Sequence, residues 1–159
     1  MQEFVAIGLG ILATHVALAL FLAHGPLPPG PWRAQPGYTA HQLISAVTMV
    51  YVTAVGGRAW FTGEVPSAHL LDRVLTRDPT GEYLAHAHLG FNLFWDLPVG
   101  FSVESLRTRS NAKLMVVHHV VMALLAWLAL YPRGLFQHYL PFFFGVCASP
   151  PALPRPRTL

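Results

Sequence analysis

The sequence is poor in charged side chains and in cysteine, and both shortages exclude classes of protein. Only 11% of the 159 residues are charged and 53% are hydrophobic, whereas about a quarter of the residues in a soluble domain are charged. Cys147 is the only cysteine, so the chain cannot form an intramolecular disulfide. This composition is typical of a membrane protein.

Signatures of nucleic-acid binding, metal binding and cofactor binding are also missing. The net charge of +3 comes from a few basic residues that flank apolar runs, as juxtamembrane basic residues do. The sequence has no glycine-rich phosphate loop, no zinc-type spacing of Cys and His, and no nucleophile elbow. We therefore expect no nucleic-acid partner, no metal and no bound cofactor.

Long apolar runs are what the sequence does contain. They cover residues 4–23, 42–61, 84–101, 114–130 and 135–148. A helix needs about 20 apolar residues to span a bilayer, and helices satisfy their backbone groups internally. The first four runs approach that length, whereas the fifth is shorter and contains Pro141. The sequence predicts an all-α fold, a multi-pass transmembrane bundle of four or five helices.

The segments around these runs carry further expectations. The first run is predicted to be a retained anchor, because no Lys or Arg precedes it and it is too long for a signal-peptide core. Residues 25–37 are expected to be non-helical through their prolines, and residues 67–75 are expected to form a short interfacial helix. The Pro/Arg-rich residues 149–159 predict a disordered tail. The distribution of Lys and Arg favours an N-terminus that faces away from the cytosol.

Asp96 is the only acidic residue inside an apolar run. A carboxylate at membrane depth costs at least about 2.5–3.5 kcal/mol, so it must face a partner or a wet cavity. His88 and Asn92 share one helix stripe with Asp96 at i, i+4, i+8 spacing, and Pro98 is expected to kink the helix. We predict a functional role for Asp96 and substrate binding by His88 and Asn92. The alternative is that His88 and Asn92 only hydrogen-bond neighbouring helices.

His118 and His119 are adjacent in the fourth run, so they point about 100° apart around a helix. His119 shares its face with Ala123 and Ala126, and such small side chains allow close approach of another helix. This helix is therefore also a candidate for pairing with a second copy or another protein. The alternative to a functional role is that both imidazoles bond to backbone carbonyls or to Asp96 and fasten two helices.

Haem binding is an alternative interpretation of the abundant histidines. His88 with His118 or His119 supplies one axial ligand from each of two helices, as in a b-type membrane cytochrome. A di-iron site is disfavoured, because His86 and His88 lie on diverging faces of a helix.

Three segments together resemble the TLC-domain family of membrane proteins, which includes ceramide synthases. "NAKLMVVHHVVMALLAWLAL" resembles the family helix that carries a His-His pair after a short basic loop. "FNLFWDLPVGF" looks like the preceding family helix, with Trp95 and Asp96 side by side. "HQLISAVTMVYVTAVGG" is similar to the helix that opens the domain, with Thr48 where many members have a His. The resemblance covers residues 40–146.

The resemblance implies a TLC-like transmembrane domain over residues 1–148. It also implies a role in membrane lipid homeostasis, in the endoplasmic reticulum or another endomembrane, with membrane lipids as partners. In ceramide synthases the His pair is regarded as essential for N-acylation of a sphingoid base from acyl-CoA. By this resemblance His118 and His119 are the candidate catalytic residues, one of them as general base, and Asp96 is the residue that orients them.

The chain departs from the family pattern after the His pair. Ceramide synthases continue with a His-Asp and further acidic residues, whereas no Asp or Glu follows Glu104 here. "CASPPALPRPRTL" stands where further family helices would follow, which predicts a C-terminus that is cut short. We therefore expect a non-enzymatic protein that binds lipid or a membrane partner, with the acyl-CoA-dependent N-acyltransferase as the alternative.

Overall fold

The computed structural model describes residues 2–62, 75–108, 110, 112–131 and 136–140. All regular secondary structure within these residues is helical, which confirms the predicted all-α class. The expected interfacial helix at 67–75 and the fifth apolar run at 135–148 lie largely outside the described residues, and the tail at 149–159 lies wholly outside them.

Three helices are long and apolar enough to span a membrane: α1 (Gln2–His24), α3 (Pro36–Thr62) and α8 (Ala112–Leu130). They contain the first, second and fourth of the predicted apolar runs. Only 17% of the most apolar window of each helix is buried within the molecule. Most of their apolar surface therefore faces outward, as lipid-facing surface does.

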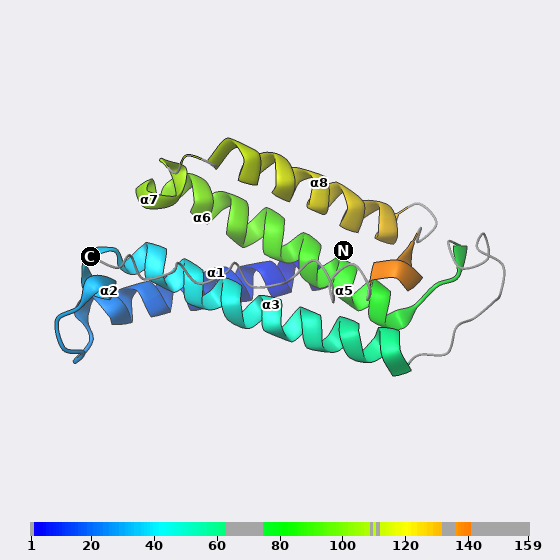
Figure 1. The fold of residues 1–159 in the computed structure, drawn as a ribbon, viewed down its shortest axis with the longest axis horizontal. Helices are drawn as coiled ribbons and strands as arrows, with labels where there is room; N and C mark the ends of the chain where they lie inside the picture. The colour runs from blue at the N-terminus through cyan, green and yellow to red at the C-terminus, as the bar shows by residue number, and fades with distance from the viewer. Residues whose placement is uncertain (1, 63–74, 109, 111, 132–135, 141–159) are drawn as a thin grey trace, which may run out of the picture.

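The third apolar run forms a continuous helical segment in the middle of the molecule. It consists of α5 (Pro79–Gly90), the π-helix η1 (Phe91–Asp96) and α6 (Leu97–Ser102). Figure 1 shows this segment between α8 on one side and α1 and α3 on the other. Asp78 caps α5, because its side chain accepts a hydrogen bond from the Gly81 N–H at 2.7 Å.

The kink expected near Pro98 takes the form of the π-helix. Pro98 has no N–H to donate to the Phe94 carbonyl, and the residues just before it widen their turn. The Leu97 N–H donates to the Asn92 carbonyl, five residues earlier. This widened turn contains both Asn92 and Asp96, so the irregular backbone lies at the polar residues.

A short helix corrects the expectation for the segment between the first two apolar runs. Residues 25–37 are not free of helix, since α2 covers Pro31–Ala34 and α3 already begins at Pro36. Proline is tolerated in the first turn because N–H groups there have no partner within the helix. In the basic segment before α8, α7 covers Glu104–Arg107. A short 3₁₀-helix, η2 (Gln137–Tyr139), follows α8.

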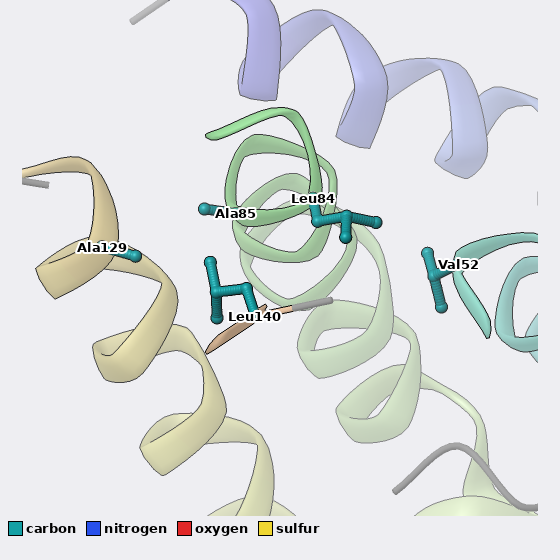
Figure 2. Close-up of a cluster of buried hydrophobic side chains, with 5 residues drawn as sticks. All are labelled: Val52, Leu84, Ala85, Ala129 and Leu140. Atoms are coloured by element: carbon teal, nitrogen blue, oxygen red, sulfur yellow. The ribbon is translucent and has the colours of Figure 1, made fainter. Parts of the chain in front are cut away.

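Packing around the central segment uses small side chains and glycine. In Figure 2, Leu84 of α5 points toward Val52 of α3, while Ala85 of α5 and Ala129 of α8 lie on the facing sides of their helices. The small face predicted on α8 thus packs against α5. On the other side, a Cβ at Gly90 would meet the Phe4 carbonyl oxygen of α1. Glycine at this position is what lets α1 and α5 approach so closely.

Candidate functional site

The centre of the site is the Asp96 carboxylate, which lies between two imidazoles. His41 Nε2 is 2.7 Å from Asp96 Oδ1, and His119 Nε2 is 2.7 Å from Asp96 Oδ2. The three side chains come from α3, η1 and α8, and the Asp96 side chain is 6% exposed. The prediction that Asp96 must face a partner is confirmed, and His119 is one of two partners.

His41 is the residue that sequence reasoning missed. The second apolar run was expected to begin at Gln42, but α3 begins at Pro36, so His41 lies inside the helix. Its ring stacks on that of Trp95 at 4.9 Å between centroids and 19° between planes. Trp95 is fully buried, so the stack fixes the His41 ring. One sequence argument could have indicated a second partner: a buried carboxylate has two oxygens, and each needs a hydrogen-bond donor.

Both ring nitrogens of His119 are engaged. The Asn92 amide nitrogen donates to the His88 carbonyl at 2.8 Å, so the amide oxygen of Asn92 faces His119. That oxygen lies 2.8 Å from His119 Nδ1 and can only accept, so His119 Nδ1 carries a hydrogen. The remaining contact, between His119 Nε2 and Asp96, then shares one proton. The pair is either carboxylate with imidazolium or carboxylic acid with imidazole, and it has zero net charge in both cases.

The contacts of His41 suit one tautomer of its ring. The Gln42 amide nitrogen lies 3.4 Å from His41 Nδ1 and can only donate, so His41 Nδ1 is the acceptor. His41 Nε2 therefore carries the hydrogen and donates to Asp96 Oδ1. In this neutral tautomer the lone pair of Nδ1 is held by a single long contact. Both nitrogens of His119 are in contacts of 2.8 Å or shorter, whereas His41 Nδ1 has only this 3.4 Å contact.

A pocket of about 290 Å³ adjoins this network. His41, Asp96 and His119 contribute its polar inner side, and apolar side chains make up most of the rest. Arg107 of α7 and Lys113 of α8 also line it. The arrangement therefore combines a proton-holding network with a mostly apolar cavity beside helices that could contact lipid.

The adjacent histidines have different surroundings, as the helical spacing predicted. His119 lines the pocket and bonds to Asp96 and Asn92, whereas His118 is exposed and does not line the pocket. The His118 ring meets the His119 ring edge-on at 5.3 Å. No hydrogen bond joins His118 to any residue that the structure describes. Of the predicted catalytic pair, only His119 reaches the pocket.

The predicted substrate-binding residues His88 and Asn92 lie apart from this pocket. Asn92 is buried and holds His119. His88 lines a second cavity of about 240 Å³ between α1, α3 and α5, together with Thr48 and the hydroxyl-bonded pair Tyr51 and Tyr83. Within the first pocket Asp96 is the only member of the predicted stripe, so the roles given to His88 and Asn92 stay predictions.

Behind Trp95 lies His15 of α1, with 6.0 Å between the two ring centroids. His15 is 6% exposed, which fits a packing histidine. Its Nδ1 and the indole nitrogen of Trp95 are both buried without a hydrogen-bond partner among the described residues. The part of the chain that is described contains no group of three or more His, Cys, Asp or Glu side chains arranged to hold a metal ion.

Comparisons of the chain with protein-family models, with curated proteins and with solved structures give no match.

Proposed function

We propose that the chain is a multi-pass membrane protein of TLC-domain type that binds a membrane lipid in the Asp96 pocket and acts in lipid homeostasis. One observation carries the proposal: a carboxylate held between His41 and His119 lies at the wall of a mostly apolar cavity of about 290 Å³. A carboxylate within the membrane that lies beside a cavity is expected to bind a ligand or to line the path of an ion or proton. Apolar lining with a few convergent polar groups is what ligand pockets present.

The number of spans belongs to the same proposal. The central segment α5–η1–α6 runs from Pro79 to Ser102, and its rise of about 1.5 Å per residue gives about 36 Å, more than the hydrocarbon thickness of about 30 Å. With α1, α3 and α8 it would make four spans. In this arrangement the polar residues of η1 contact other helices rather than lipid, and an endomembrane such as the endoplasmic reticulum is the proposed location.

A substitution that fills the pocket with a larger side chain tests whether lipid binds there. Val116 lines the pocket from α8, whereas Val120, one turn later, is 52% exposed and lies outside the lining. Val116→Trp is expected to reduce the amount of lipid that stays bound to the purified chain in native mass spectrometry. Val120→Trp is the matched control and is expected to leave it unchanged. Equal retention by all three proteins would contradict the proposal.

Acyl transfer is the second candidate function, and the tautomer of His41 favours it. An amine that attacks a thioester carbonyl forms the new C–N bond and must lose one proton, which His41 Nδ1 can accept. The C–S bond then breaks, and the leaving thiolate takes that proton from His41. Asp96 holds the His41 ring in the required tautomer, as an orienting carboxylate does in hydrolase triads. This assigns the general-base role to His41 rather than to His118 or His119.

The two candidate functions are separated by turnover. Purified chain with labelled acyl-CoA and a sphingoid base is expected to yield the N-acyl product if the second function holds. Loss of a general base lowers such a rate by about 10²–10⁴-fold, so His41→Ala should abolish most product while His118→Ala retains it. If the wild-type chain binds lipid but forms no product, the acyltransferase function fails and the lipid-binding function stands.

A further inference from the structure

Two basic side chains share the pocket with the Asp96 network. Arg107 of α7 and Lys113 of α8 are both exposed, and both line the cavity. Among the described residues neither forms an ion pair with a carboxylate. The pocket therefore carries two positive charges that no described side chain neutralises.

The inner side of the pocket adds no net charge to this balance. Asp96 and His119 share one proton and are neutral as a pair, and the contact of His41 Nδ1 with the Gln42 amide nitrogen suits a neutral ring. Asp96 is the only acidic residue among the described residues that line the pocket. A ligand that enters meets a net positive charge at Arg107 and Lys113, so its complement is an anionic group.

The remaining lining defines the other part of the ligand. Leu97, Phe101 and Met115 are among the apolar side chains that make up most of the cavity wall. Such a wall complements a hydrocarbon chain. Charge and lining together fit an amphiphile that has an anionic head and an apolar tail.

The position of the two basic residues in the fold matches the headgroup level of a bilayer. Lys113 is in the first turn of α8, and Arg107 ends the short helix just before it. Figure 1 shows α7 at the same end of the molecule as α2, which carries Arg33. Basic side chains at the ends of spanning helices lie at the level of the lipid headgroups, where they attract anionic lipids.

We propose that this pocket binds an anionic membrane lipid, with the headgroup phosphate at Arg107 and Lys113 and an acyl chain along the apolar wall. The inference rests on the proposed lipid-binding function and specifies its ligand. A volume of about 290 Å³ is at the lower limit of ligand cavities, which enclose about 300–1,000 Å³. The pocket therefore holds the glycerophosphate region and the beginning of one chain, and the bilayer takes the rest.

The test compares phosphatidic acid with phosphatidylcholine of the same acyl chains, each titrated into the purified full-length chain and followed by native mass spectrometry. The wild-type chain should prefer phosphatidic acid. The double variant Arg107→Gln, Lys113→Gln should lose about fivefold in affinity for phosphatidic acid per basic residue removed. It should lose less for phosphatidylcholine, because the choline cation offsets the charge of its phosphate. Both residues are exposed, so the double variant is expected to fold.

The matched control is the double variant Arg58→Gln, Arg77→Gln. It removes the same charge, but Arg58 lies 17 residues beyond His41 on α3, about 25 Å along the helix, and neither residue lines the pocket. The control should bind phosphatidic acid as the wild type does. An equal loss in both double variants, or no loss in either, would overturn the inference.

Two further outcomes separate the possible sources of failure. Inorganic phosphate should not displace phosphatidic acid, because the acyl chain contributes to binding; displacement at equal concentration would mean that the site recognises free phosphate and would overturn the inference. If the wild-type chain binds both lipids equally and Val116→Trp reduces both, the preference for anionic lipid fails while the lipid-binding function stands. If neither lipid binds, the proposed function itself fails.

Discussion

The central segment α5–η1–α6 and the outer helix α8 show opposite relations between polarity and burial. In α5 eight of the twelve residues are buried, among them His86 and His88, and in η1 Asn92 and Asp96 are buried as well. In α8 only three residues, all alanines, are buried, and most of its Leu and Val side chains are exposed. The most polar helical run is thus inside the molecule and the most apolar surface is outside.

This arrangement follows from a bilayer as solvent. Lipid tails are as apolar as leucine, so burying leucine gives little driving force between helices, whereas polar groups gain by leaving lipid and pairing with each other. Small residues then set how close the helices approach, as Gly90 does for α1 and the three alanines of α8 do for α5. Substitutions should therefore cost most where they remove a polar contact of the inner segment and least on the outer surface.

The largest effect is expected for Asp96→Ala. It leaves Nε2 of His41 and Nε2 of His119 without their common partner, and removing one partner of a buried charged pair costs about 3–5 kcal/mol. The free energy of unfolding, measured by SDS titration in mixed micelles and followed by circular dichroism, should fall by about that amount.

Asp96→Asn is the control for the same position. Its amide oxygen can accept from His41 Nε2, and its amide nitrogen can donate to the lone pair of a neutral His119 Nε2. All contacts of the network stay satisfied, so the loss in unfolding free energy should be much smaller than for alanine. A loss equal to that of Asp96→Ala would contradict the assigned single shared proton.

A smaller but clear effect is expected for Gly90→Ala. The added Cβ would meet the Phe4 carbonyl oxygen and the Gly8 backbone, so α1 and α5 must move apart. Overpacking of this kind costs about 1–3 kcal/mol, and the same SDS titration measures it. Gly10→Ala on α1 is the control, because its Cβ meets nothing within 4 Å. Two glycine variants of equal stability would refute the close contact.

The sequence was sufficient to locate the long apolar helices but only part of the site. Apolar runs of near-spanning length lie within α1, α3, α8 and the α5–η1–α6 segment, because length and apolarity are local properties. The single acid in an apolar run likewise identified Asp96 as a residue that needs a partner. The sequence did not identify His41 as the partner, because its contact with Asp96 spans 55 positions along the chain. No local pattern determines which histidine of another helix fills that place.

The π-helix is a second feature that the sequence indicated only in part. Pro98 indicated a disturbed helical turn, because it cannot donate a backbone hydrogen bond. A kink and a π-helix are two different ways in which the helix accommodates that loss. The wider turn at Phe91–Asp96 changes the angle between Asn92 and Asp96. Both then reach the two nitrogens of His119, whereas His88 lines the other cavity. The helical-wheel stripe assumed a regular α-helix, whereas in the structure His88 and Asp96 line two different cavities.

The smallest effect is expected for His118→Ala, although His118 adjoins a residue of the network. His118 is exposed, and no hydrogen bond joins it to the described residues, so its removal should change the unfolding free energy by less than about 0.5 kcal/mol, as surface substitutions do. His119→Ala leaves Asp96 Oδ2 and the Asn92 oxygen without their partner and should cost about 1–3 kcal/mol. Parallel SDS titrations of the two alanine variants measure the difference. Equal losses in unfolding free energy would contradict this assignment. They would mean that orientation toward the central segment does not decide how much each histidine contributes to stability.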